Sequence, residues 1–149
     1  MSKVEVTIRY ATLTKNYDIV GKMENFVKVK VNNGTGGSTE FKTKIVPGDK
    51  DTKIEWNETF SVPIKPNTGS FFEFTVMDED MTTDDVCGKG LFRPDRCGVF
   101  NYGSAQNYNI RLVNDPNDQI SGGLHITTRY VWSRSIIFLC ISLKPTSVG

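Results

Sequence analysis

Apolar and polar residues alternate along most of this chain with a period of two. Residues 4–10 read Val-Glu-Val-Thr-Ile-Arg-Tyr, and residues 26–31 repeat the pattern as Phe-Val-Lys-Val-Lys-Val. Successive side chains of a strand point to opposite faces, so this period predicts strands with one buried face. Gly, Asn, Asp and Pro separate the alternating segments, as in turns rather than at helix caps. The pattern predicts strands at residues 4–10, 26–31, 41–45, 58–64, 71–77, 87–92, 107–113 and 122–131.

Eight such segments with short polar connections predict an all-β chain, folded as an eight-stranded antiparallel β-sandwich. Residues 32–37 are rich in turn formers and join two of the segments, which predicts a hairpin at that point. The 149 residues are a typical length for one domain. We place this domain at residues 1–131 and treat residues 132–149 as an apolar C-terminal tail.

The tail has an apolar core of roughly half the ~20 residues that a transmembrane helix requires. We therefore expect that it does not span a bilayer. An apolar, β-prone run promotes aggregation when it is left bare. The tail is expected to add an extra strand, to cover an exposed patch or to dock onto another chain.

The charges almost cancel, with 18 Lys and Arg against 17 Asp and Glu, so no global basic field is available for nucleic acid. The first residues contain no apolar signal core, and the three cysteines lack zinc-ligand spacing, which favours a reducing cytoplasmic location. The chain has one histidine, His125, within a predicted strand, and we interpret it as structural. Without a nucleophile, histidine and acid set or a glycine-rich nucleotide loop, the chain is not expected to be an enzyme.

Five acidic residues follow directly on the apolar segment 71–77. Like charges in one loop repel each other unless a cation neutralises them, and several hard carboxylate oxygens suit calcium better than a soft transition metal. An EF-hand loop is excluded, because Thr83 and Lys89 stand where that motif requires Gly and Glu. A solvated polar loop is the alternative to a calcium site. The five residues are Asp78, Glu79, Asp80, Asp84 and Asp85.

Three motifs occur in a fixed order along the chain. Residues 18–29 read Asp-Ile-Val-Gly-Lys-Met-Glu-Asn-Phe-Val-Lys-Val, residues 56–60 read Trp-Asn-Glu-Thr-Phe, and residues 76–88 run from Val-Met-Asp-Glu-Asp to Asp-Val-Cys-Gly. Together they resemble the first loop, the Trp-Asn-Glu-x-Phe block and the third loop of the C2 domain family. The resemblance covers about residues 3–131 and implies the calcium- and phospholipid-binding β-sandwich, in the circular permutation called type II.

The family's calcium ligands, carried over by position, fall on both acidic loops. Glu24 stands where the family usually has Asp, and Asn25 replaces the Pro that follows. The third loop is also one residue shorter than common versions. The additional methylene of Glu24 predicts weaker coordination or the loss of one ion, with Asp84 either compensating or merely solvated. The resemblance implies that Ca²⁺ is bound by Asp18, Glu24, Asp78, Asp80 and Asp85.

In this family calcium turns an acidic pocket into a cationic one that accepts lipid phosphates. The resemblance therefore implies a calcium-dependent module that attaches reversibly to anionic phospholipid membranes, as a cytoplasmic, peripheral membrane protein. Apolar side chains beside the ligands are costly to expose unless they insert somewhere, although Ile19 or Val20 could instead fold back as a plug of the loop. The predicted inserting residues are Ile19, Val20, Met23 and Met81.

Four lysines alternate on the two strands of the predicted hairpin, and pairing of the strands brings them onto one face. No acid interrupts them in this interpretation, and they are similar to the phosphoinositide-binding patch of the C2 domains of conventional protein kinases C. Lysines on exposed strands also protect sheet edges from aggregation, which is the competing explanation. The candidate lipid contacts are Lys28, Lys30, Lys42 and Lys44.

The alternative function is a C2 domain used as a calcium-independent interaction or scaffold subunit, docked onto a protein partner in a larger assembly. Many members of the family are used in this way. The apolar tail at residues 132–149 is the segment through which such a partner would bind.

Overall fold

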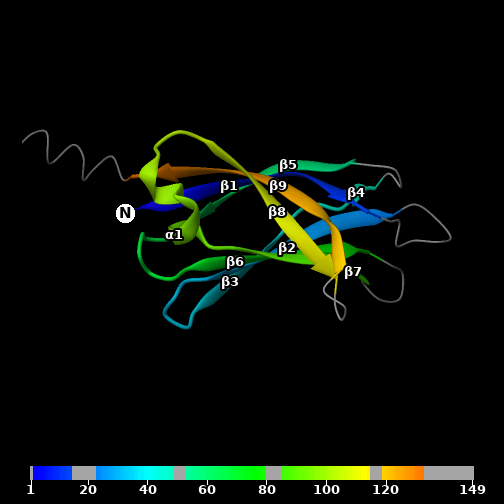
Figure 1. Ribbon diagram of the computed structural model, residues 1–149, viewed down its shortest axis with the longest axis horizontal. Helices are drawn as coiled ribbons and strands as arrows, with labels where there is room; N and C mark the ends of the chain where they lie inside the picture. Colours follow the sequence, from blue (N-terminus) through cyan, green and yellow to red (C-terminus); the bar gives the residue numbers. More distant parts are fainter. Residues whose placement is uncertain (1, 15–22, 49–52, 80–84, 115–118, 133–149) are drawn as a thin grey trace, which may run out of the picture.

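The computed structural model describes residues 2–14, 23–48, 53–79, 85–114 and 119–132. These residues form nine strands, a short helix and a single 3-10 turn (Figure 1). The elements are β1 (Lys3–Leu13), β2 (Glu24–Asn32), β3 (Ser38–Lys42), β4 (Val46–Pro47), β5 (Lys53–Val62), β6 (Phe71–Asp78), β7 (Asp85–Phe92), α1 (Pro94–Cys97), η1 (Val99–Asn101), β8 (Gln106–Asn114) and β9 (Gln119–Val131).

The strands pair antiparallel in the order β3-β2-β6-β7-β8-β9-β1-β5, and β4 pairs with β2. In the part of the chain that the structure describes, β7 and β8 are joined by one residue pair, Lys89 with Val113. The sheet bends over at this seam, so that a first half-sheet (β3, β2, β6 and β7) faces a second half-sheet (β8, β9, β1 and β5) (Figure 1). The predicted all-β antiparallel sandwich is confirmed.

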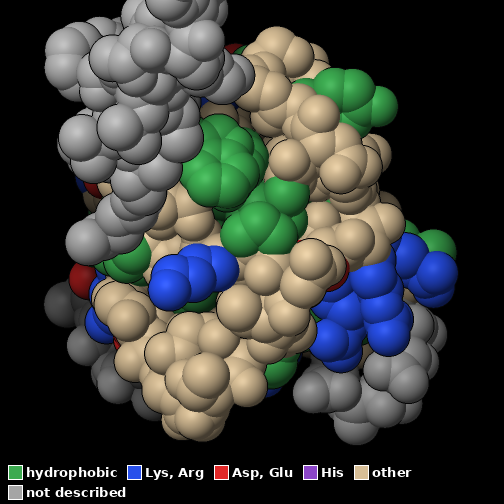
Figure 2. Space-filling model, turned by 90° about the vertical axis from the view of Figure 1, so that its left-hand side faces the viewer, with side chains coloured by type: hydrophobic (Ala, Val, Ile, Leu, Met, Phe, Trp, Pro, Cys, Tyr) green, Lys and Arg blue, Asp and Glu red, His purple; other side chains and the backbone are tan. Residues whose placement is uncertain are grey.

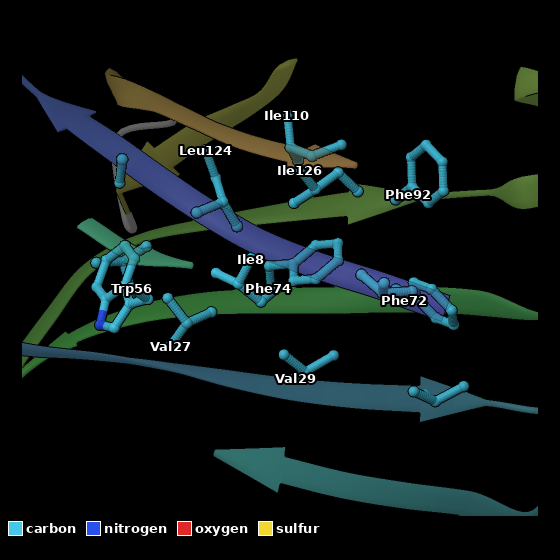
Figure 3. Packing of buried hydrophobic residues seen from close by; sticks show 14 of the residues in the cluster. Ile8, Val27, Val29, Trp56, Phe72, Phe74, Phe92, Ile110, Leu124 and Ile126 are labelled. Atoms are coloured by element: carbon cyan, nitrogen blue, oxygen red, sulfur yellow. The ribbon is translucent and has the colours of Figure 1, made fainter. Parts of the chain in front are cut away.

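Side chains from both half-sheets point into the space between them and form one core (Figure 3). Phe72 and Phe74 of β6 and Ile126 of β9 are fully buried, and each such side chain contributes about 1.5–3 kcal/mol of transfer free energy. Two glycines of β7 allow the close approach at the seam. A Cβ atom at Gly88 would lie 2.9 Å from Cβ of Leu112, closer than real Cβ contacts allow.

The predicted strands all occur, with shifted ends. The strand expected at 41–45 is β3, which ends at Lys42. Thr43, the next residue, is buried and bonds to β2 twice: its N–H donates to the carbonyl oxygen of Val27 at 2.9 Å, and its Oγ1 accepts the N–H of Val27 at 2.8 Å. The strand expected at 58–64 is β5, which begins at Lys53 and pairs with β1 from there. The predicted hairpin is confirmed by the pairing of Asn32 with Ser38.

Candidate functional site

The ends of β6 and β7 bring two predicted calcium ligands together. Asp78 is the last residue of β6, Asp85 is the first residue of β7, and the two are directly paired across the strands. Asp78 is only 4% exposed, whereas Asp85 is exposed. Because like charges directly opposite each other destabilise a strand pair, this arrangement favours a bound cation. Hard carboxylate oxygens are the donors that calcium prefers, so the pair fits that ion.

The start of β2 lies against this pair. The N–H of Glu24 donates to Oδ1 of Asp78 at 3.2 Å, and the N–H of Glu79 donates to the carbonyl oxygen of Glu24 at 2.7 Å. The Glu24 side chain is exposed. Thus the side chains of Asp78 and Asp85 and the backbone of Glu24 lie together at one end of the sandwich, which we call the acidic end.

Asn25 connects the strands behind the acidic end, a role that the sequence analysis did not find. Its side chain is fully buried, and Nδ2 donates to the carbonyl oxygen of Met77 at 3.0 Å, next to Asp78. Its own carbonyl oxygen accepts the indole N–H of Trp56 on β5 at 3.2 Å. The signal in the sequence was an amide side chain at the position where the family has Pro, because an amide can donate where Pro cannot.

The thiol of Cys87 lies near the acidic end, and the negative charges of that end affect its pKa. Burial, together with the negative charges of Asp78 and Asp85, raises the pKa of Cys87 to about 12, while a hydrogen bond from Asn25 acts in the opposite direction. Cys87 therefore remains a protonated, unreactive thiol at neutral pH.

Several predicted site residues cannot be placed in this arrangement. Among the residues that the structure describes, no group of three His, Cys, Asp or Glu side chains is arranged to hold a metal ion. Met23 is a correction: its side chain is 2% exposed and belongs to the core, so it does not present an apolar tip to a membrane. Outside the described residues lie Asp18, Ile19, Val20, Asp80, Met81 and Asp84.

Lys28, Lys30 and Lys42 lie on the outward side of the first half-sheet, but acids separate some of them. Lys28 pairs directly with Lys42. Lys30, in contrast, pairs with Glu40 on one side and with Glu73 on the other. The expectation of a patch without acids is therefore wrong, because the neighbouring strands supply carboxylates in register with Lys30.

The remaining lysine differs from the other three, and a further one joins them. Lys44 lies beyond the end of β3, and its backbone N–H donates to Oε2 of Glu58 at 2.9 Å. Lys89 on β7 pairs with Thr75, which in turn pairs with Lys28. The row from Lys42 through Lys28 to Lys89 thus extends the positive charge towards the seam. The sequence analysis missed Lys89, because the residues around it do not reveal how β6 pairs with β7.

Comparisons with known proteins identify the same kind of fold as the structure. The model of the C2 domain family matches residues 2–108, and the chain belongs to this family. FT-interacting protein 3 of Arabidopsis thaliana is 33% identical over 75 residues, which are 50% of this chain and 9% of that protein. The chain therefore spans about a tenth of the length of this curated relative.

Solved structures share the fold at low sequence identity. A single C2 domain of plant extended synaptotagmin 1 superposes with a TM-score of 0.67 at 20% identity, over 87% of this chain and 93% of that one. A calcium-bound fragment of extended synaptotagmin 2, which comprises a pair of C2 domains, gives a TM-score of 0.62 at 17% identity, over 87% of this chain and 45% of that one. Within the described residues, none of the helices has the length and apolar character needed to cross a membrane.

Proposed function

We propose that this chain is a calcium-dependent module that attaches reversibly to anionic phospholipid membranes from the cytoplasmic side. The observation that carries the proposal is the direct pairing of Asp78 with Asp85 beside the start of β2. Calcium, when bound, supplies positive charge and free coordination positions for lipid phosphate. Its ligands in this proposal are Asp18, Glu24, Asp78, Asp80 and Asp85.

The chain's own residues have distinct parts in this process. The Asp78 and Asp85 carboxylates repel each other, so they hold an entering cation and lose that repulsion when it binds. Asn25 keeps the carbonyl group of Met77, and with it the end of β6, in position. Ile19, Val20 and Met81 are the apolar residues proposed to enter the interface, and lysines of the first half-sheet add attraction to anionic headgroups.

The lysine contacts have a graded strength in this proposal. Lys28 and Lys42 face each other without an intervening acid, so they contribute most, at about 1 kcal/mol for each lysine near an anionic surface. Lys30 contributes less because Glu40 and Glu73 flank it. The backbone N–H of Lys44 already donates to Glu58, so only the Lys44 side chain is available to a lipid headgroup.

Sedimentation with phosphatidylcholine vesicles that contain phosphatidylserine, in calcium and in chelator, tests the proposal. The protein is expected to sediment only in calcium, and the double variant Asp78→Asn/Asp80→Asn is expected to stay in the supernatant in both. The matched control is Glu5→Gln/Glu55→Gln. It also removes two carboxylates, but from exposed ion pairs to Arg129 (2.8 Å) and Lys53 (3.3 Å), which contribute little to stability.

Absence of sedimentation in both conditions would overturn the membrane proposal. The second candidate, a calcium-independent interaction module, would then be preferred. The observation that favours it is the exposure of Trp132, which is 53% accessible and is the first residue of the apolar tail and the last one that the structure describes. Large exposed aromatic side chains are common anchors of protein interfaces.

A further inference from the structure

A cavity of about 410 Å³ opens on the outward side of the second half-sheet, which carries none of the proposed lipid contacts. The cavity exists because β9, which lies between β1 and β8, has two glycines without side chains at this point. Gly123 of β9 pairs with Thr12 of β1 on one side and with Arg111 of β8 on the other. The cavity is lined by Thr12, Leu13, Thr14, Asn109, Arg111 and the backbone of Gly122 and Gly123.

The walls of this cavity leave no room for side chains on its floor. A Cβ atom at Gly123 would come 2.5 Å from Oδ1 of Asn109, and one at Gly122 would overlap the carbonyl oxygen of Thr12. Gly122 also has a φ of +153°, which L side chains rarely adopt. Gly122 and Gly123 therefore keep the cavity open, because any larger residue at either position would displace the atoms that form its walls.

The charge around the cavity is positive. Arg111 is exposed, and within the described residues no ion pair engages its guanidinium group and no carboxylate lines the cavity. In the next row, Tyr10 and His125 stack with ring centroids 4.2 Å apart. The nearest acid in that row, Glu55, pairs with Lys53 at 3.3 Å. Among the described residues, an anion entering this cavity therefore meets Arg111 and no lining carboxylate; on its other side Arg111 borders a second cavity, which Glu73 and Lys89 line.

We propose that this cavity binds a phosphate monoester carried on a small polyol. The planar guanidinium group of Arg111 matches two phosphate oxygens, while the Asn109 amide and the Thr12 hydroxyl donate to others. The volume exceeds that of a phosphate alone and leaves space for a hydroxylated ring or chain. The source of the phosphate is either a soluble metabolite or a lipid headgroup, since both present the same group.

The position of the cavity relates it to the membrane without depending on calcium. It lies where β1 ends and β9 begins, at the same end of the sandwich as the end of β6 (Figure 1). A headgroup held there would lie beside the acidic end but on the opposite half-sheet from the lysines. The inference goes beyond the proposed function, because it requires neither the acidic end nor the lysines.

Titration of the ¹⁵N-labelled chain by nuclear magnetic resonance, in chelator and without vesicles, tests the site. The soluble probes are glycerol 3-phosphate and inositol 1,4,5-trisphosphate. The amide signals of Thr12, Gly122 and Gly123 are expected to shift most. Arg111→Gln is expected to weaken binding at least about tenfold, because a charge-assisted bidentate contact is lost. The control Arg96→Gln removes the same charge from an exposed position in α1 and should leave binding unchanged.

A second pair of variants tests the shape of the cavity with the charge unchanged. Gly123→Ala is expected to abolish binding by filling the floor, whereas Gly103→Ala, whose added Cβ meets nothing within 4 Å, should bind as the wild type does. Thermal unfolding of both variants establishes that they remain folded at the titration temperature. Equal weakening by Arg96→Gln, or signal shifts centred on Lys28 and Lys42, would overturn the proposal in favour of unspecific attraction.

Phosphatidylcholine vesicles that contain phosphatidylinositol 4-phosphate, again in chelator, distinguish the two sources of phosphate. Binding that Arg111→Gln abolishes identifies a lipid headgroup. Binding of the soluble esters alone identifies a soluble metabolite, and binding of neither overturns the proposal. Because calcium is absent throughout, these outcomes are separate from those of the calcium-dependent sedimentation described above.

Discussion

The acidic end and the lysine face of the first half-sheet arrange like charges in opposite ways. At the acidic end, Asp78 lies directly opposite Asp85, with the backbone of Glu24 alongside. On the lysine face, one like-charged pair is retained, Lys28 with Lys42, whereas Lys30 has a glutamate on each side. The same sheet therefore concentrates negative charge at its end and mixes both signs on its surface.

The difference indicates which region depends more on a ligand. Asp78 is almost completely buried, so its repulsion with Asp85 acts where solvent screens charge poorly. Lys30 and Lys42 are exposed and Lys28 is half-buried, so water and salt screen these charges better than they screen Asp78. At the end that carries α1, apolar side chains gather in one patch with Lys and Arg side chains on either side, and few Asp or Glu side chains are in view among the described residues (Figure 2). We therefore expect a cation at the acidic end to affect the protein more than an anion at the lysine face.

The largest expected effect is the response of stability to calcium. Binding to the folded state alone stabilises a protein by about 2.7 kcal/mol at a concentration one hundred times the Kd. Urea denaturation with and without calcium measures this increase. Asp85→Asn is expected to remove most of it, while in chelator the variant should be at least as stable as the wild type because the repulsion with Asp78 is gone.

The control for this prediction is Glu55→Gln, a carboxylate in an exposed ion pair on β5. It should retain the full stabilisation by calcium. An Asp85→Asn protein that calcium stabilises as much as the wild type would show that the acidic end does not bind the ion.

A smaller effect should separate the two kinds of lysine. With vesicles that contain a phosphoinositide, Lys28→Gln is expected to weaken partitioning about fivefold, which corresponds to about 1 kcal/mol. Lys30→Gln should weaken it less, because Glu40 and Glu73 already offset that charge. Vesicle sedimentation at a single salt concentration compares the two. Equal losses would mean that register within the sheet does not matter and that only net charge does.

The smallest effect concerns His125, which lies on the second half-sheet and titrates independently of both charged regions. Burial lowers the pKa of His125 below its ordinary value of 6.5, and the positive charges of Arg9 and Lys53 lower it further. The unfolded chain therefore takes up this proton at higher pH than the folded one. The stability that the neutral ring contributes is present above pH 6.5 and is lost as the pH falls through the folded pKa.

Urea denaturation between about pH 7.5 and 5 measures this dependence. His125→Gln is expected to flatten the decrease in the free energy of unfolding, by less than the effects at the acidic end. An unchanged slope in this variant would assign the decrease to other groups.

Much of this picture followed from local sequence. Alternation predicted each long strand, because burial on one face of a strand depends on the parity of the position alone. The acidic run after residue 77 and the motif at residues 56–60 indicated the family, which its model then confirmed. Local sequence also predicted the hairpin that joins the strands of Lys28 and Lys42, whereas the direct pairing of these two residues comes from the structure.

Other features depended on contacts between distant segments. Met23 has the same sequence surroundings as an exposed loop residue, yet it is buried because β2 packs against the second half-sheet. Glu73 flanks Lys30 because β6 lies beside β2, and Thr12, Gly123 and Arg111 form one row because β9 lies between β1 and β8. Within the long strands, sequence by itself determined which side chains face outward. Only the tertiary structure decided which of them are neighbours, because strand order and register are set by the packing of the whole core.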